Sequence, residues 1–175
     1  MTFGFIGMLL KLLRGEGQLG GRPEFVAVAL DVSGDQGTFR SRIYPEYKAQ
    51  RPPPPEDLFP QVERCLAILK DIGVPVIGSE GFEADDVVAS IVERLEREKP
   101  ELRVRIVSKD KDLKQLLRGE DAAKQVAPVE LFDIHTDLKI GVEELKADLG
   151  LAPKQIIDYL ALMGDTVDNV PMSAR

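Results

Sequence analysis

The sequence predicts an α/β domain in which a mostly parallel central sheet carries helices on both faces, a three-layer sandwich. Three runs are predicted as strands: Phe25–Leu30, Val74–Ile77 and Arg103–Val107. The continuous apolar run Phe25–Leu30 suits a strand that is buried on both faces, as in a parallel sheet. Segments with helical periodicity separate these runs, and alternation of strand and helix is typical of repeated βα units. The length of 175 residues indicates a single domain, residues 1–175.

The remaining elements follow from apolar periodicity and from glycine and proline positions. Two short strands are expected around Pro128, within Gln125–Ile134. The last expected helix turns four apolar side chains inward, those of Ile156, Ile157, Leu160 and Met163. Helices are expected over Thr2–Leu13, Glu56–Ile72, Glu83–Lys99, Ser108–Gly119, Gly141–Leu149 and Pro153–Met163.

Composition bounds the class of protein. Apolar residues make up 43% of the chain and charged residues 30%, which is typical of a globular domain with a buried core. The single cysteine, Cys65, excludes an internal disulfide and is expected in the core. The apolar run Phe3–Leu13 is too short to span a bilayer, so we expect a cytoplasmic protein without a membrane partner.

Acidic residues follow all three expected strands. The carboxyl ends of parallel strands share one edge of a sheet, so these side chains are expected to converge there. An oxygen-only set indicates Mg²⁺ or Mn²⁺ rather than zinc, and suits two-ion phosphoryl transfer. The sole histidine, His135, is expected at the surface and not as a ligand. The candidate ligands are Asp31, Glu83, Asp85, Asp86, Asp110, Asp112, Asp165 and Asp168.

Each of these acids, taken singly, has a structural explanation as a helix cap or a turn residue. Doubled acids at separate helix starts on one sheet edge favour a metal site instead. The net charge of −7 at first disfavours a nucleic-acid partner. Setting the eight clustered acids aside leaves acidic and basic residues nearly equal in number, so the rest of the surface can carry a local basic patch.

Residues 38–55, which we call the clamp segment, have the complementary chemistry. Lysine and arginine neutralise phosphates, and aromatic rings stack on unpaired bases. A solvated loop with incidental charge explains the same composition, and the sequence leaves both interpretations open. The segment contains Phe39, Arg40, Arg42, Tyr44, Tyr47, Lys48 and Arg51, followed by Pro52–Pro55.

Five segments together match one known family. They are Phe5–Leu13, Tyr44–Arg51, Glu80–Val87, Asp110–Leu113 and Ile156–Asp165. From Phe3 to about Pro171 the chain resembles the 5′-nuclease domain of bacterial DNA polymerase I, a relative of the flap endonucleases. The resemblance implies a PIN-like or resolvase-like 5′-nuclease fold. It also implies a metal-dependent 5′-3′ exonuclease or 5′-flap endonuclease that hydrolyses DNA in replication and repair.

The resemblance further assigns roles to residues. It implies that the eight acids ligate two Mg²⁺ or Mn²⁺ ions directly or through water, with Asp31, Asp86 and Asp110 central to catalysis. Lys48 would contact the scissile phosphate. The implied partner is DNA with a 5′ single-strand to duplex junction, and a fused polymerase region, a monomeric state and a nucleoid-associated location in the bacterial cytoplasm are expected with it. The implied DNA-binding set is Arg40, Tyr44, Tyr47, Lys48 and Arg51, in which Tyr47 stacks on a terminal base.

Three departures from the family pattern stand out. Family members open with a strand that ends in Asp-Gly, whereas this sequence begins at the following helix. They continue into a glycine-rich helix-hairpin-helix where this sequence has Met172–Arg175. Lys109 replaces a small residue, and beside Asp110 it would either weaken metal binding or contact phosphate. We therefore expect an incomplete domain, an unpaired side on the Phe25–Leu30 strand, and weak or absent activity.

Three other functions remain open at the level of sequence. A non-catalytic DNA-binding remnant would keep the basic segment and bind DNA without divalent ions. A single-strand ribonuclease of similar fold would share the acidic edge. A receiver-type signalling domain also uses a strand-end acidic pair with Mg²⁺, but eight dispersed carboxylates fit it poorly.

Overall fold

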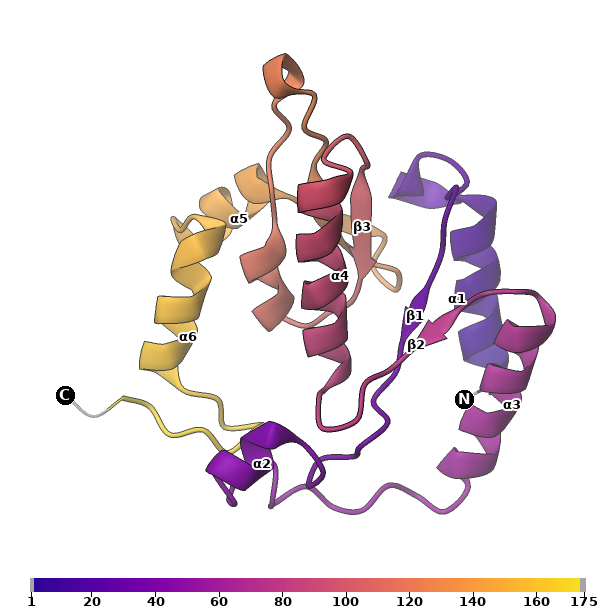
Figure 1. The fold of residues 1–175 in the computed structure, drawn as a ribbon, viewed down its shortest axis with the longest axis vertical. Coiled ribbons are helices and arrows are strands. Elements are labelled where there is room, and N and C mark those ends of the chain that lie inside the picture. Colours follow the sequence, from indigo (N-terminus) through magenta and orange to yellow (C-terminus); the bar gives the residue numbers. More distant parts are fainter. Residues whose placement is uncertain (1, 174–175) are drawn as a thin grey trace.

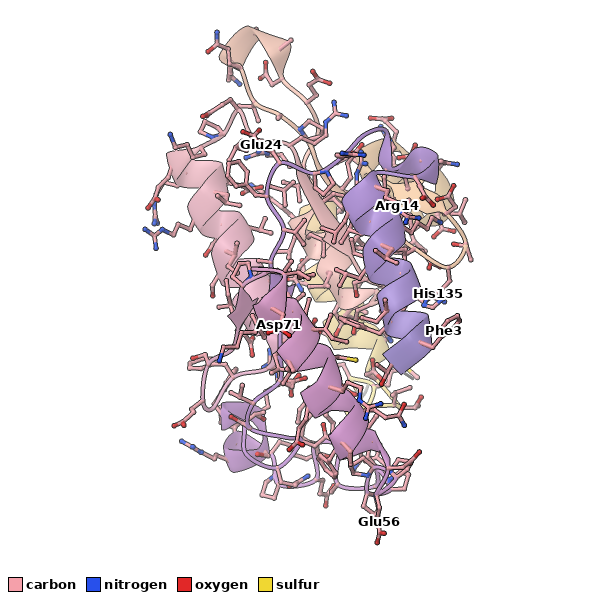
Figure 2. The ribbon with its side chains drawn as sticks, turned by 90° about the vertical axis from the view of Figure 1, so that its right-hand side faces the viewer. Phe3, Arg14, Glu24, Glu56, Asp71 and His135 are labelled. Carbon is pink, nitrogen blue, oxygen red and sulfur yellow. The ribbon has the colours of Figure 1, made fainter. Side chains whose placement is uncertain are left out.

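The computed structural model describes residues 2–173, so Met1, Ala174 and Arg175, at the ends of the expected 1–175 domain, lie outside the described residues. The α/β class is confirmed, with helices on both sides of the strands. In Figure 1, α1 (Thr2–Arg14) and α3 (Leu58–Asp71) lie to the right of the strands, and α4 (Ala84–Glu98) and α6 (Ile156–Met163) lie to the left. Figure 2 views α1 and α3 from their outer side.

The strands form two sheets rather than one. β1 (Val28–Ala29) pairs in parallel with β2 (Val76–Ile77). β3 (Val104–Val107) pairs in parallel with β4 (Val129–Asp133), and β4 pairs antiparallel with β5 (Leu138–Ile140). Within residues 2–173, β1 and β3 each have one strand neighbour. The expected unpaired side of the Phe25–Leu30 strand is therefore present, and Phe25 itself is 74% exposed.

Several boundaries differ from the sequence prediction for local reasons. The helix expected over Ser108–Gly119 is only a 3₁₀ turn, η2 (Asp112–Leu116), because an antiparallel bridge between Arg118 and Val129 draws the chain away. One strand, β4, and not two, forms around Pro128, and β5 was not expected.

The clamp segment, expected to be irregular, contains α2 (Phe39–Ile43), which Thr38 caps by accepting the Ser41 N–H. The remaining short elements are η1 (Gly17–Leu19), η3 (Ala122–Lys124), α5 (Val142–Leu149) and η4 (Pro153–Gln155).

The main core lies between α4, the β3–β4–β5 sheet and the C-terminal helices. Cys65 is buried, as expected. Ile157 and Met163 were expected inward but are more than half exposed, at 56% and 51%. No helix in residues 2–173 combines the length and the apolar character needed to cross a membrane. The core cluster contains Val92, Ile106, Leu113, Leu117, Val129, Leu131, Leu145 and Ile156.

Burial predicts a large effect and a small effect for the same substitution at two helical leucines. Leu145 is fully buried in the core, and Leu162 is 63% exposed on α6. Leu145→Ala should lower the free energy of unfolding by about 2–5 kcal/mol, because it removes apolar contact and leaves a cavity. Leu162→Ala should change it by less than about 0.5 kcal/mol. Urea denaturation measures both, and equal effects would contradict this packing.

Candidate metal and nucleic-acid site

The eight acidic residues predicted as ligands face one region, which we call the acidic rim. They come from the segments after β1, β2 and β3 and from the turn after α6. Several hydrogen bonds hold them there. The acidic rim consists of Asp31, Glu83, Asp85, Asp86, Asp110, Asp112, Asp165 and Asp168.

The start of α4 is the centre of the acidic rim. Glu83 is the N-cap residue of α4, and the Asp86 carboxylate accepts the Glu83 N–H at 2.9 Å. The Asp31 carboxylate accepts the Ala84 N–H at 2.9 Å, which ties the end of β1 to the same helix start. Free N–H groups and the positive end of the helix dipole stabilise anions at this position. The carboxylates that accept backbone N–H groups at the start of α4 are therefore also members of the acidic rim.

Turn hydrogen bonds fix the other members of the acidic rim. The Asp110 carboxylate accepts the Asp112 N–H at 2.8 Å at the start of η2. The Asp165 carboxylate accepts the N–H groups of Val167 and Asp168 at 2.8 and 3.1 Å. These hydrogen bonds orient the Asp110 and Asp165 side chains within their own turns.

Burial and neighbouring charge both act on the carboxylates of the acidic rim. Burial, and then the charge of Asp110, raise the pKa of Asp85 from 3.8 to about 6, and Asp31, Glu83 and Asp112 contribute to this shift. Burial, followed by repulsion from Asp110, also raises the pKa of Asp112. Crowded carboxylates resist ionisation unless a cation compensates them. The acidic rim is therefore a site of unbalanced negative charge.

The clamp segment lies against the acidic rim. Lys48 Nζ is 2.8 Å from Glu83 Oε2 and 3.7 Å from Asp168 Oδ2, and the Lys48 side chain is only 9% exposed. The Tyr47 hydroxyl donates toward Glu83 at 3.2 Å and Asp168 at 3.0 Å. Arg51 pairs with Asp168. Segments more than 100 residues apart are joined here, and Figure 1 shows α2 beside the chain that follows α6.

Arg40 forms the most complete ion pair of the site. Its Nη1 and Nη2 atoms donate to the two carboxylate oxygens of Asp86 at 2.6 and 2.7 Å. This geometry, with two parallel bonds, is the strong form of the arginine–carboxylate interaction. The hydrogen bond from Arg40 is the main cause of the lowered pKa of Asp86.

The remaining predicted residues take varied positions. The Tyr44 hydroxyl donates to the exposed Glu46 at 3.0 Å. Tyr47 is 7% exposed, so base stacking by its ring requires the clamp segment to move. Lys109, expected beside Asp110, has its Nζ 3.8 Å from Asp133, a carboxylate outside the acidic rim. His135 is exposed, as expected, and lies near α1 in Figure 2.

The donor chemistry of the acidic rim fits hard divalent cations. Glu83 Oε1 and Asp112 Oδ1 are buried and have no hydrogen-bond partner among the described residues. Buried oxygens without partners are costly and mark positions where a cation belongs. Even so, no group of three His, Cys, Asp or Glu side chains in residues 2–173 is arranged to enclose a metal ion. The candidate ligands gather in one region of the described residues without forming a closed cage.

Sequence reasoning missed three contacts of this site. Lys111 Nζ is 2.8 Å from Asp165 Oδ2. Gln50 donates to the carbonyl of Val167 at 3.0 Å, and Asn169 donates to the carbonyl of Glu46 at 2.8 Å. The position of Lys111 between two acids was a visible signal, whereas the two amide contacts have no signature in the sequence.

Comparison with known proteins agrees with this architecture. The parallel strands and the helices on both faces define an α/β domain with the fold of the phage T5 5′-exonuclease. That solved structure aligns with 98% of this chain and 59% of its own, with a TM-score of 0.69 and 22% identity. A T5 flap endonuclease in a pseudo-enzyme–product complex with DNA and metal ions aligns over 98% of this chain and 61% of its own, with a TM-score of 0.63 and 23% identity.

Sequence relatives define the family more closely. Residues 1–150 match the model of the family described as "5'-3' exonuclease, N-terminal resolvase-like domain". DNA polymerase I of Rhizobium leguminosarum is 40% identical over 170 residues, which cover 96% of this chain and 16% of the relative. A 5′-3′ exonuclease of Aquifex aeolicus is 37% identical over 169 residues, 97% of this chain and 53% of the relative.

The chain belongs to the family of N-terminal resolvase-like domains of 5′-3′ exonucleases. It spans between about a sixth and a half of the length of these two relatives.

The raised pKa of Asp85 predicts that replacing this residue increases the free energy of unfolding in a pH-dependent way. EDTA in the buffer removes divalent ions from the comparison. The folded-state pKa of about 6 lies above the ordinary 3.8, so ionisation of Asp85 costs stability as the pH rises between these values. After allowance for solvent screening, Asp85→Asn should raise the free energy of unfolding by about 1–2 kcal/mol at pH 7.5 and by almost nothing near pH 4.

Urea denaturation at the two pH values measures this difference. Asp158→Asn, on an exposed residue in the first turn of α6, is the matched control and should show no such pH-dependent gain, because the helix dipole favours an anion there. A gain that is independent of pH, or one shared by the control, would contradict the crowding of charge around Asp85.

Proposed function

We propose that this chain acts as a divalent-metal-dependent 5′ nuclease domain that hydrolyses DNA phosphodiesters near a single-strand to duplex junction. One observation carries the proposal: eight carboxylates from four separate segments gather at one rim, and a basic, aromatic segment is folded against three of them, Glu83, Asp86 and Asp168. Membership of the exonuclease family supports it. We propose residues 1–175 as one nuclease domain and the clamp segment as its DNA-contacting part.

The reaction adds water to phosphorus and breaks the bond to the 3′ oxygen, which leaves a 5′-phosphate and a 3′-hydroxyl. When bound, two Mg²⁺ or Mn²⁺ ions supply an activated water and stabilise the departing oxygen. The residues proposed to hold them are the eight of the acidic rim, with Asp31, Asp86 and Asp110 closest to the chemistry. Glu83 Oε1 and Asp112 Oδ1 offer lone pairs that the fold leaves unused.

The clamp segment is proposed to position the DNA. Lys48 is assigned to the scissile phosphate, and Arg40 and Arg51 to the phosphates of the 5′ strand. Tyr44 and Tyr47 are assigned to unpaired bases. A fused polymerase region in a longer protein, a monomeric state and a nucleoid-associated place in the bacterial cytoplasm belong to the same proposal.

Cleavage of a labelled 5′-flap DNA tests the proposal. We expect weak hydrolysis that needs Mg²⁺ or Mn²⁺ and stops in EDTA. Asp110→Asn should lower the rate by at least about 100-fold, because it removes a charge from the metal ligands while keeping the side-chain shape.

Glu80→Gln makes the same chemical change on an exposed neighbour outside the acidic rim and should retain the wild-type rate. Wild-type cleavage no faster than that of Asp110→Asn would overturn the nuclease proposal. Metal-independent binding of the same DNA would then favour the non-catalytic remnant. Faster cleavage of an RNA strand of the same sequence would favour the ribonuclease.

Salt dependence tests the role of Arg51. In Mg²⁺, with Asp110→Asn as the background that prevents cleavage, Arg51→Gln should reduce the slope of log affinity against log salt by about 0.7, the loss of one single-strand phosphate contact. The effect should be uniform across DNA sequences, as for a backbone contact. Fluorescence anisotropy measures the slope. Lys124→Gln, on the distant η3, is the control, and an equal change there would refute an Arg51 phosphate contact.

A further inference from the structure

Three cationic side chains of the clamp segment form ion pairs within the protein. Arg40 binds both oxygens of Asp86 at 2.6 and 2.7 Å. Lys48 lies 2.8 Å from Glu83, and Arg51 pairs with Asp168. These are the cations that the proposed function assigns to DNA phosphates, and the carboxylates are those that it assigns to divalent ions. The cations proposed to bind DNA and the carboxylates proposed to bind metal therefore bind each other in this structure.

The pairs are sequestered as well as close. The side chains of Lys48 and Glu83 are 9% and 10% exposed. Both oxygens of Asp86 accept from Arg40, and Asp86 Oδ2 also accepts the Glu83 N–H at 2.9 Å. While Arg40 is bound, three of the roughly four acceptor positions of the Asp86 carboxylate are filled, so a metal ion that binds both oxygens must displace Arg40.

One oxygen stands apart from this pattern. Glu83 Oε1 is buried and has no partner among the described residues, although the other oxygen of the same carboxylate holds Lys48. A single ammonium group therefore does not satisfy Glu83. A divalent cation with a larger charge would use the vacant lone pairs as well. The basic side chains are thus incomplete substitutes for metal at this position.

We propose that Arg40, Lys48 and Arg51 are internal counter-ions of the acidic rim, which divalent cations displace, and that this exchange releases the clamp segment to bind DNA. The inference rests on the proposed function and adds a regulation to it. Binding of metal frees cations for phosphate, and binding of phosphate frees carboxylates for metal. By thermodynamic linkage the two ligands must strengthen each other by the same factor.

The chain contains a matched control for this exchange. Arg42 lies two residues from Arg40 on the same short helix, but its side chain is exposed and forms no ion pair within residues 2–173. Asp31 offers a second control, because its carboxylate accepts a backbone N–H and holds no cation among the described residues. Each control changes the local charge by the same amount without breaking an ion pair.

Metal affinity without DNA tests the first half of the exchange. Calorimetric titration of the full chain with Mn²⁺ should show that Arg40→Gln tightens binding by about five- to thirtyfold, since a strong ion pair no longer competes. Arg42→Gln should tighten it by less than about twofold, through screened long-range charge alone. Circular dichroism checks that both variants fold.

DNA affinity in EDTA tests the second half. Asp86→Asn keeps an acceptor for the Glu83 N–H but releases Arg40, so it should raise affinity for a 5′-tailed duplex by at least about fivefold. Asp31→Asn removes the same charge and should raise it by less than about twofold.

The outcomes separate the two proposals. If the wild type binds no Mn²⁺, both the metal-dependent nuclease function and the displacement of counter-ions by divalent cations are refuted. If it binds Mn²⁺ but Arg40→Gln behaves like Arg42→Gln, or Asp86→Asn behaves like Asp31→Asn, the exchange is overturned and the metal site stands.

Discussion

Repulsion among like charges is the constraint on which the rest of this structure depends. Carboxylates from four distant segments share one edge of the fold, and burial, followed by the charges of its neighbours, raises the pKa of Asp85 there. Basic side chains offset the negative charge: Arg40, Lys48 and Arg51 from the clamp segment, and Lys111 from the turn after β3. The position of the clamp segment follows from this charge balance, because its docking contacts are mainly ion pairs and hydrogen bonds.

The acidic residues serve two purposes at once. Asp31 and Asp86 satisfy backbone N–H groups at the start of α4, and Asp110 and Asp165 do so in turns. A carboxylate in such a bond keeps lone pairs free for a further ligand. The structural explanation of each acid and its proposed metal role are therefore compatible. Local hydrogen bonds supply the rigidity that a binding site needs before any ligand arrives.

Local chemistry made much of this fold predictable. The apolar runs located β1, β2 and β3, and the acids that follow them located the acidic rim, because strand ends share an edge in any parallel arrangement. Strong tertiary contacts decided what the sequence did not reveal. The bridge between Arg118 and Val129 shortened the helix expected after β3. The pairing of Arg51 with Asp168 spans 117 residues and has no periodic signature.

Burial sets how readily the ion pairs can exchange. Lys48 and Glu83 are almost fully enclosed, and separating a buried pair costs several kcal/mol unless each charge finds another partner. Arg40 and Arg51 are about one third exposed, where ion pairs are weaker and water assists their separation. The arginine pairs should therefore open first. Lys48 should leave Glu83 only when a cation replaces it there and a phosphate receives its charge, so the most buried pair is the one that most requires both ligands together.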